Sequence, residues 1–342
     1  MSWHKILILL GVIAAIHLVV IFGCVSGSGS GENLPPDPFA AVRESFFDRL
    51  FADTGGRERE TSTPGVRPWD YSRMLEIPET LAQKAQRASS VIIVELSGRR
   101  VLWEKNSRNP VAIASLTKLM TALLVAEKLE KDPQFKLDEV ITISPAAAAV
   151  ESRKFSAGTR LTVQDLILAM MIASSNDAAF QLAERVASSV PAFVEMMNER
   201  ADKMGLSAVK FNSPNGLPQG KERENSYAAA ADVIHLCEAL MKYPVIMSAC
   251  SESYAKLSND YPVYTTNGLL LHPRSNRPYY RKVPGLIGFK TGYTNAAKFC
   301  LAFGVERKGR VFLGCVTGFP SAADRERFCN ELIEWAYTVS QE

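Results

Sequence analysis

The sequence predicts an α+β fold in which one antiparallel sheet carries helices on its faces, beside a helical subdomain. Three observations predict this fold. Strand patterns stand at both ends of residues 80–342, helical patterns fill the middle, and two neighbouring strand patterns near the end are joined by a tight turn. Because strands at both ends with helices between them favour a single sheet, we expect the first and last strands to be adjacent.

The composition is that of a globular protein without a nucleic-acid partner. The 342 residues are 47% hydrophobic, which is enough for a sizeable core, and the net charge is only +3. No basic stripe is interleaved with aromatic residues, no glycine-rich phosphate loop precedes a helix, and the four histidines lack ligand spacing. We therefore expect no nucleic acid, no cofactor and no metal ion. The six cysteines form no Cys-x-x-Cys pair, so most are expected to be small buried residues.

The N-terminal residues 1–25 are predicted to be a membrane anchor or signal segment. Residues 6–25 are almost wholly apolar, Lys5 precedes them, and no lysine or arginine follows until Arg43. This length and charge distribution is typical of a membrane helix whose C-terminal side is exported. The residues before Cys24 are similar to a bacterial lipoprotein cleavage site, so lipidation of that cysteine stays an alternative. Both readings place the protein in the cell envelope, on the outer face of the cytoplasmic membrane or in the periplasm.

Residues 26–79 are predicted to be a flexible spacer. They begin with alternating serine and glycine, and then become rich in proline, arginine, glutamate and glycine. Such composition cannot bury enough apolar surface to form a core of its own. The folded domain is expected over residues 80–342.

The domain is predicted to open with two strands and a buried helix. Residues 90–96 and 100–104 are apolar and β-branched runs joined by a Ser-Gly turn. A long helix opens near Ser115, because apolar residues then recur at helical spacing without glycine or proline. A short strand follows at residues 140–143.

Helices then dominate until the final strands. We expect helices at 163–173 (with Thr162 as N-cap), 178–186, 191–204 and 226–243. Proline and asparagine interrupt residues 245–285. The last elements are a strand leading into Lys290, an antiparallel strand pair at 299–305 and 311–317 that turns at Lys308-Gly309, and a closing helix at 324–337.

Ser115 and Lys118 lie three residues apart, on one face of the predicted helix. A hydroxyl becomes a good nucleophile when a base takes its proton, and a lysine amine is such a base when burial or a nearby cation lowers its pKa. The spacing alone is weak evidence, because an ordinary helix-start serine would look the same. It recurs at Ser2/Lys5, Ser207/Lys210 and Ser253/Lys256. Only Ser115 opens a long apolar helix.

Two further polar motifs stand in apolar surroundings. Ser174-Ser-Asn176 separates two apolar helices, where its side chains need partners or water, although a plain helix connection is the simpler reading. The motif is common, as Ser213-Pro-Asn215 illustrates. Lys290-Thr-Gly292 follows an apolar strand, and a glycine there often marks close approach by a ligand or another backbone.

Together and in this order, the three motifs resemble those of the penicillin-recognising serine acyl-transferases, which include penicillin-binding proteins and serine β-lactamases. The longer strings at residues 113–121, 173–179, 211–217 and 288–294 resemble the low-molecular-weight D-alanyl-D-alanine carboxypeptidases. The resemblance covers roughly residues 80–340. It implies a β-lactamase/transpeptidase-like fold and a serine peptidase of peptidoglycan biosynthesis that affects cell shape.

The resemblance also implies catalytic roles. Ser115 would attack the carbonyl between two D-alanines and hold the acyl group, and Lys118 would take its proton. Ser174 would relay a proton to the leaving amine, and Asn176 would position Lys118 and a substrate amide. The charge of Lys290 would lower the pKa of Lys118 by like-charge repulsion.

The remaining roles concern substrate binding. Lys290 and Thr291 would receive the terminal carboxylate, and Gly292 would let the substrate backbone lie along the strand edge. The backbone N–H groups of Ser115 and Tyr293 would form the oxyanion hole. The implied partners are a peptidoglycan stem peptide, β-lactam inhibitors and, through the N-terminal segment, a membrane. A DD-endopeptidase, a β-lactamase and a non-catalytic wall-ligand binding module remain alternatives on the same fold.

Overall fold

The computed structural model describes residues 67–220, 223–270 and 283–339, all of which belong to one compact unit. The predicted anchor at residues 1–25, with Cys24, and most of the predicted spacer lie outside the described residues. Within the described residues no single helix is both long and apolar enough to cross a membrane, but the bent pair α9 (Ala230–Leu240) and α10 (Pro244–Ser251) meets that test jointly.

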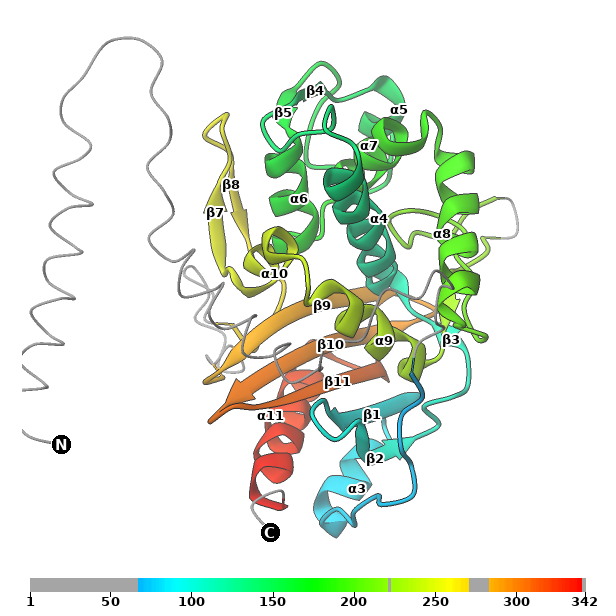
Figure 1. The fold of residues 1–342 in the computed structure, drawn as a ribbon, viewed down its shortest axis with the longest axis vertical. Helices are drawn as coiled ribbons and strands as arrows, with labels where there is room; N and C mark the ends of the chain where they lie inside the picture. Colours follow the sequence, from blue (N-terminus) through cyan, green and yellow to red (C-terminus); the bar gives the residue numbers. More distant parts are fainter. Residues whose placement is uncertain (1–66, 221–222, 271–282, 340–342) are drawn as a thin grey trace, which may run out of the picture. The chain divides into compact units, whose positions relative to one another are not determined.

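A five-stranded antiparallel sheet forms the centre of the domain, with strand order β2-β1-β11-β10-β9 (Figure 1). Its strands are β1 (Ser90–Glu95), β2 (Arg100–Lys105), β9 (Leu286–Thr294), β10 (Lys298–Arg307) and β11 (Arg310–Phe319). The first strand pairs directly with the last, with Ile92 opposite Cys315. The predicted α+β class and the adjacency of the first and last strands are therefore confirmed.

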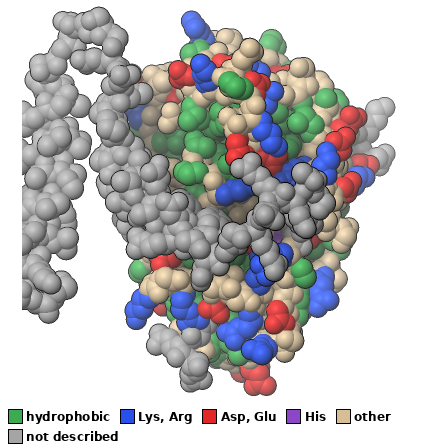
Figure 2. Space-filling view, in the orientation of Figure 1, with side chains coloured by type: hydrophobic (Ala, Val, Ile, Leu, Met, Phe, Trp, Pro, Cys, Tyr) green, Lys and Arg blue, Asp and Glu red, His purple; other side chains and the backbone are tan. Residues whose placement is uncertain are grey.

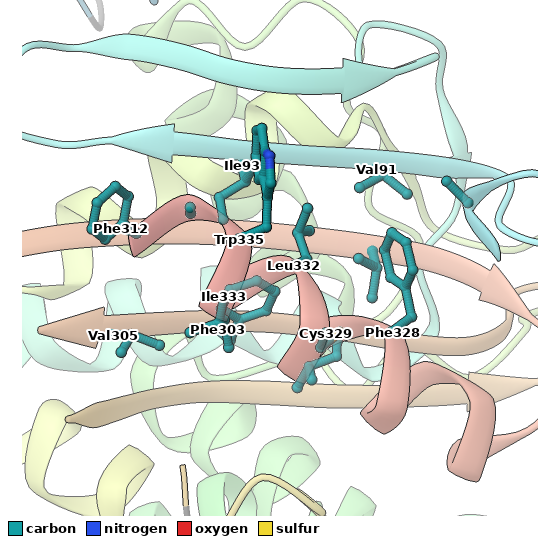
Figure 3. Packing of buried hydrophobic residues seen from close by; sticks show 14 of the residues in the cluster. Val91, Ile93, Phe303, Val305, Phe312, Phe328, Cys329, Leu332, Ile333 and Trp335 are labelled. Carbon is teal, nitrogen blue, oxygen red and sulfur yellow. The ribbon is translucent and has the colours of Figure 1, made fainter. Parts of the chain in front are cut away.

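One face of the sheet is covered by α3 (Glu79–Ala85) and α11 (Ala322–Val339). Alternate residues of β1, Val91 and Ile93, point into this layer, because side chains of a strand alternate between its faces. Figure 3 shows Phe328, Leu332 and Trp335 of α11 packed against them, at the i, i+4, i+7 spacing of one helical face. Burying each such side chain contributes about 1.5–3 kcal/mol to folding.

The opposite face of the sheet carries the helical part of the domain. Helix α9 packs against β11, β10 and β1, while α10 and α6 contact β9, the strand drawn beside the label of α10 in Figure 1. The central helix α4 is buried from Lys118 to Glu127, because helices surround it.

The helices of this part are α4 (Lys118–Lys131), α5 (Pro145–Ala148), α6 (Val163–Ile172), α7 (Asn176–Ala187) and α8 (Val190–Met204). The short strands are β3 (Val111–Ala112), β4 (Val140–Thr142), β5 (Arg160–Thr162), β6 (Tyr227–Ala228), β7 (Tyr254–Lys256) and β8 (Pro262–Tyr264).

The predicted start of α6 is confirmed in detail. The Thr162 hydroxyl accepts a hydrogen bond from the Asp165 backbone N–H at 3.0 Å, and the Asp165 carboxylate accepts one from the Thr162 N–H at 2.9 Å. This reciprocal pair satisfies two N–H groups that the first turn of a helix leaves unpaired. Asp165 also accepts hydrogen bonds from Ser258, so the cap joins α6 to the β7–β8 hairpin.

The helix predicted at 226–243 is wrong at both ends. Tyr227 and Ala228 form β6, which pairs with β3, and α9 begins only at Ala230. Tertiary pairing of the backbone therefore overrides a helical side-chain pattern at this point. The segment 245–285, which proline and asparagine interrupt, contains α10 and the β7–β8 hairpin.

Residues just upstream of α3 belong to the folded domain. The Asp70 N–H donates to the Arg99 carbonyl at 2.8 Å, and the Val101 N–H donates to the Asp70 carbonyl at 2.8 Å. Further along, the Leu75 N–H donates to the Leu102 carbonyl at 2.7 Å. Because β2 is an edge strand, this segment covers backbone groups that would otherwise be unpaired. The hydrogen bonds of the domain thus extend upstream of residue 79, where the spacer is predicted to end.

The cysteines within the described residues are buried free thiols, as the composition suggested: Cys237, Cys250, Cys300, Cys315 and Cys329. Burial raises the pKa of Cys300 to about 11 and that of Cys250 to about 12. These side chains therefore pack as small apolar residues.

Candidate active site

Ser115 and Lys118 lie together at the entrance to α4. Ser115 is in a 3-10 turn, Ala114–Thr117, and Lys118 is the first residue of α4. The Lys118 Nζ lies 2.9 Å from the Ser115 Oγ. The sequence predicts this proximity from the i, i+3 spacing. The structure adds that the Lys118 side chain is fully buried.

Lys118 has two other hydrogen-bond partners, and both are acceptors. Its Nζ lies 2.8 Å from the Asn176 Oδ1 and 2.6 Å from the Asn215 carbonyl oxygen. A neutral amine has two N–H groups and one lone pair. When the two oxygens take the two N–H groups, the lone pair is directed at the Ser115 hydroxyl, which can donate to it. The neutral form of Lys118 is thus oriented to accept the Ser115 proton.

The environment of Lys118 favours that neutral form. Burial lowers the pKa of Lys118 well below its usual value, and the nearby positive charge of Lys290 lowers it further. The carboxylate of Asp177 acts in the opposite direction. Two cations in a water-poor region cost more than one, so loss of a proton is favoured there.

The second motif is brought to Lys118 at the start of α7. Asn176 is the first residue of that helix, and its Nδ2 donates to the Glu151 carbonyl at 3.1 Å. Ser174 lies between α6 and α7 with a φ of 57° and is partly buried. In the described part of the chain, no hydrogen bond joins the Ser174 hydroxyl to either lysine. The relay role of Ser174 therefore stays a prediction.

The third motif lies on β9. Lys290 is 1% exposed, and its Nζ donates to the Thr291 carbonyl at 3.0 Å. Burial lowers the pKa of Lys290 to about 7, with smaller contributions from Arg325 and Lys154, while Cys250 opposes the shift. Within the described residues no carboxylate pairs with the Lys290 ammonium, so its charged form is suited to bind an anionic ligand.

Neighbouring residues of β9 complete this side of the site. The Thr291 hydroxyl lies 2.5 Å from that of Thr266. A Cβ on Gly292 would lie 2.9 Å from the Ile113 carbonyl oxygen and 3.2 Å from the Ser115 nitrogen, so the strand passes the Ser115 turn at backbone distance. Tyr293 is 51% exposed, and its ring packs on Phe299 at 4.4 Å between centroids.

Asn215 also contributes to the site, which the sequence did not predict. Its carbonyl oxygen accepts from Lys118 and lies 3.5 Å from the Ser115 Oγ. Gly216, with a φ of 81°, fits where a Cβ would lie 2.0 Å from the Ala114 carbonyl oxygen. The Thr121 hydroxyl also donates to the Pro214 carbonyl, at 2.6 Å. The Asn-Gly pair in the string at residues 211–217 predicts a turn, but it does not predict which residues the turn contacts.

Basic and acidic side chains are interspersed over the described part of the face shown in Figure 2, with hydrophobic side chains visible between them in the upper, helical half. No large field of one sign therefore dominates that visible part. The charges that matter at the site are the local ones around Lys118 and Lys290.

This arrangement is suited to covalent acyl transfer. A hydroxyl nucleophile, an oriented neutral amine and a second buried amine meet beside the edge strand of a sheet. An edge strand offers backbone groups that can pair with an extended peptide.

Comparisons with known proteins agree with this chemistry. Residues 78–318 match the protein family described as D-alanyl-D-alanine carboxypeptidase. The chain is 31% identical over 260 residues to the D-alanyl-D-alanine carboxypeptidase DacF of Bacillus subtilis (strain 168), a match covering 75% of this chain and 64% of that protein. It is 32% identical over 225 residues to a D-alanyl-D-alanine endopeptidase of Escherichia coli (strain K12), covering 65% of this chain and 68% of that one.

A solved structure is similar over most of its length. Penicillin-binding protein D2 from Listeria monocytogenes, in its cefotaxime-bound form, superimposes with a TM-score of 0.63 at 26% identity. The match covers 72% of this chain and 96% of that chain. By contrast, the chain matches slightly less than two thirds of the length of DacF.

Proposed function

Because the chain belongs to the D-alanyl-D-alanine carboxypeptidase family, we propose that it removes the terminal D-alanine from peptidoglycan pentapeptides. The reaction is a hydrolysis that proceeds through an acyl-enzyme on Ser115. The observation that carries this proposal is the environment of Lys118, whose two other partners are both acceptors, so that its lone pair faces the Ser115 hydroxyl.

In the acylation step the Ser115 Oγ attacks the carbonyl carbon between the two D-alanines, and its proton moves to Lys118. An ester bond forms to Ser115, and the amide C–N bond breaks. The leaving amine takes a proton that Lys118 supplies, with Ser174 as relay. Water then hydrolyses the ester, with Lys118 acting again as base, and the shortened peptide leaves.

The substrate is held by β9. The charged form of Lys290 and the Thr291 hydroxyl bind the terminal carboxylate, and the peptide backbone lies along the strand edge at Gly292. The N–H groups of Ser115 and Tyr293 stabilise the developing oxyanion, each contributing on the order of 3 kcal/mol. The close passage of β9 by the Ser115 turn supports this pairing of donors.

The same site accounts for inhibition by β-lactams. A β-lactam carries a strained amide and a carboxylate, so it can acylate Ser115 in place of a peptide. The cefotaxime-bound form of the Listeria protein supports this ligand class. The site of action is the cell envelope, where peptidoglycan lies. We propose that residues 1–25 anchor the enzyme there, residues 26–79 act as a spacer, and the catalytic domain occupies residues 80–342 together with the upstream contacts of β2.

Endopeptidase activity is the second candidate, favoured by the 32% identity to an Escherichia coli endopeptidase. The chemistry would be identical, and only the substrate would differ. Cross-linked and uncross-linked stem peptides, offered side by side to the purified protein, separate the two activities by the product released.

The direct test replaces Ser115 by alanine in the full chain. The S115A variant should lose both covalent labelling by a fluorescent penicillin and release of D-alanine from a D-Ala-D-Ala peptide, because the nucleophile is absent. Mass spectrometry of the labelled wild type should locate the adduct on Ser115. As a matched control, Ser207→Ala removes the serine of another Ser-x-x-Lys spacing and should leave labelling intact. Labelling that survives in S115A would overturn the assignment.

A further inference from the structure

We propose that Asp177, directly after the Ser174-Ser-Asn176 motif, is a positioning residue that holds the Asn176 amide on Lys118 through the loop of residues 151–155. This inference rests on the proposed function, because it assigns a role in the same acylation step. It gives a role to a residue of the string at 173–179 to which the sequence assigned none.

The Asp177 carboxylate is fully buried, and all of its hydrogen-bond acceptor positions are occupied. Its Oδ2 accepts hydrogen bonds from the backbone N–H groups of Lys154 and Phe155, at 2.7 and 2.6 Å. Its Oδ1 accepts from the Ala178 N–H at 3.1 Å and from the Ser175 hydroxyl. A carboxylate has about four acceptor positions, so these four donors leave none free. Asp177 thus fixes one end of the loop to the start of α7.

The other end of that loop fixes the Asn176 amide. The Glu151 carbonyl accepts from the Asn176 Nδ2 at 3.1 Å, while the Asn176 Oδ1 faces the Lys118 Nζ at 2.8 Å. The two ends of an amide differ, because one accepts and the other donates. If the loop moved away, the amide could rotate and present an N–H group to Lys118. The amine would then lose the acceptor that directs its lone pair toward Ser115.

Asp177 also acts on Lys118 by its charge. Its carboxylate favours the protonated form of Lys118 and so opposes burial and the charge of Lys290 on β9. The groups around Lys290 are Arg325 of α11, Lys154 of the loop and Cys250 of α10. A neutral side chain at position 177 should therefore lower the pKa of Lys118 further. The acidic limb of the pH–rate profile would move to lower pH, because Lys118 must be neutral to act as base.

A purely structural role would give a different result. An acidic residue in the first turn of a helix stabilises that helix by its interaction with the helix dipole. Asp165 in α6 has that role: it is 4% exposed and accepts from the N–H groups of Thr162 and Ser258. Asp165 is not among the charges that act on Lys118. It is therefore a matched control for loss of a buried, helix-capping carboxylate.

The experiment compares the full-length D177N and D165N variants with the wild type. The second-order rate constant of acylation by a fluorescent penicillin is measured across pH, with thermal unfolding measured in parallel. We expect D177N to acylate on the order of 100-fold more slowly, as for a misplaced catalytic group, and to shift its acidic limb to lower pH. D165N should lose stability but keep the limb of the wild type.

The positioning role would be overturned if D177N and D165N acylated equally slowly and both kept the acidic limb of the wild-type pH–rate profile. An acylation rate constant in D177N equal to that of the wild type would overturn it too. If D177N does not fold, Asp177→Glu replaces it. The longer side chain keeps the charge but displaces the loop, so D177E should keep the wild-type limb and lose rate, and a wild-type rate in D177E would refute the proposal. Failure of the proposed function itself is distinguishable, because the wild type would then show no labelling.

Discussion

At the scale of single residues, the candidate site contains two lysines, Lys118 and Lys290, and burial disfavours the charged form of each. Lys118 has three hydrogen-bond partners, whereas the Lys290 Nζ has one within the described residues, the Thr291 carbonyl. A buried ammonium with few partners is costly, which is why the pKa of Lys290 falls to about 7. That cost is offset when an anionic ligand arrives.

This difference predicts a pH dependence of substrate binding. Because only the protonated form of Lys290 attracts a carboxylate, and its pKa in the free protein is about 7, the KM for a D-Ala-D-Ala peptide should rise as pH increases above about 7. The kcat should fall instead on the acidic side, where Lys118 gains a proton. Steady-state kinetics across neutral pH would measure both.

Two controls sharpen that measurement. A peptide whose C-terminal carboxylate is replaced by an amide should show a KM that does not change with pH. Lys290→Arg keeps its charge at every pH used, so any binding that remains should lose the alkaline rise in KM. A KM for the carboxylate peptide that stays flat through neutral pH would contradict the role of Lys290.

The sequence could predict part of this site. The Ser115–Lys118 contact follows from helical geometry, since residues three apart share a face. The contact of Lys118 with Asn176 required the resemblance to a family, because the two residues are distant in the chain. The Asn215 carbonyl was missed, since a backbone acceptor has no residue type to recognise.

At the scale of elements, the Ser115 turn is held between a loop and a strand. Gly216 of the loop packs against the Ala114 carbonyl, and Gly292 of β9 approaches the Ser115 nitrogen. Both positions exclude a Cβ, so the turn cannot shift without moving backbone on either side. This explains how a short 3-10 turn can hold the Ser115 side chain in place.

A pair of glycine substitutions tests the importance of the loop. Gly216 and Gly205 have positive φ values of 81° and 74°, so alanine should cost about 1–2 kcal/mol of stability at each. A Cβ at Gly216 would meet the Ala114 carbonyl oxygen at 2.0 Å, whereas one at Gly205 would meet nothing within 4 Å. Penicillin acylation should fall on the order of 100-fold in G216A and stay normal in G205A.

Thermal unfolding should show that both variants lose stability because of the positive φ. G216A should lose more than G205A, because its Cβ also clashes with the Ala114 carbonyl. An acylation rate that is normal in G216A would show that the loop does not hold the Ser115 turn.

Elements were predicted best where a side-chain pattern and a backbone requirement agree. The strands β10 and β11, with their turn at Lys308-Gly309, combine apolar runs with a glycine that tolerates positive φ. The helix predicted at 226–243 begins too early, because the backbone of residues 227–228 pairs with β3, a partner remote in the chain. No local pattern contains that information.

At the scale of the whole molecule, the two edges of the sheet differ in what lies along them. The segment from Arg67 to Ile77 lies along β2 and is fixed by Trp69, which is 6% exposed. The Trp69 ring stacks on His235 at 5.4 Å between centroids, and the Arg99 guanidinium lies 4.3 Å from the ring centroid. The opposite edge, β9, carries the third motif.

Replacing Trp69 by alanine should therefore reduce stability without changing the chemistry. Loss of a buried tryptophan typically costs about 3–5 kcal/mol. Denaturant unfolding of the full-length W69A variant should show this loss, while its acylation rate constant at a temperature where it is folded should match the wild type. Met74→Ala, in the same segment but 47% exposed, should change stability little. Slow acylation in folded W69A would show that the two edges are coupled.

The strand order has a consequence for how the domain folds during synthesis. The middle strand of the sheet, β11, is the last strand in the chain. A growing polypeptide that has emerged only as far as Ser115, or even past β9, lacks β10 and β11, so β1 is paired only with β2 and β9 has no strand beside it. The sheet cannot close until β11 has been synthesised, and its contacts are distant in sequence, which is typical of slower folding. Nascent or truncated chains that lack β11 should thus not react with a penicillin, and antibiotic labelling should mark only chains in which the sheet is complete.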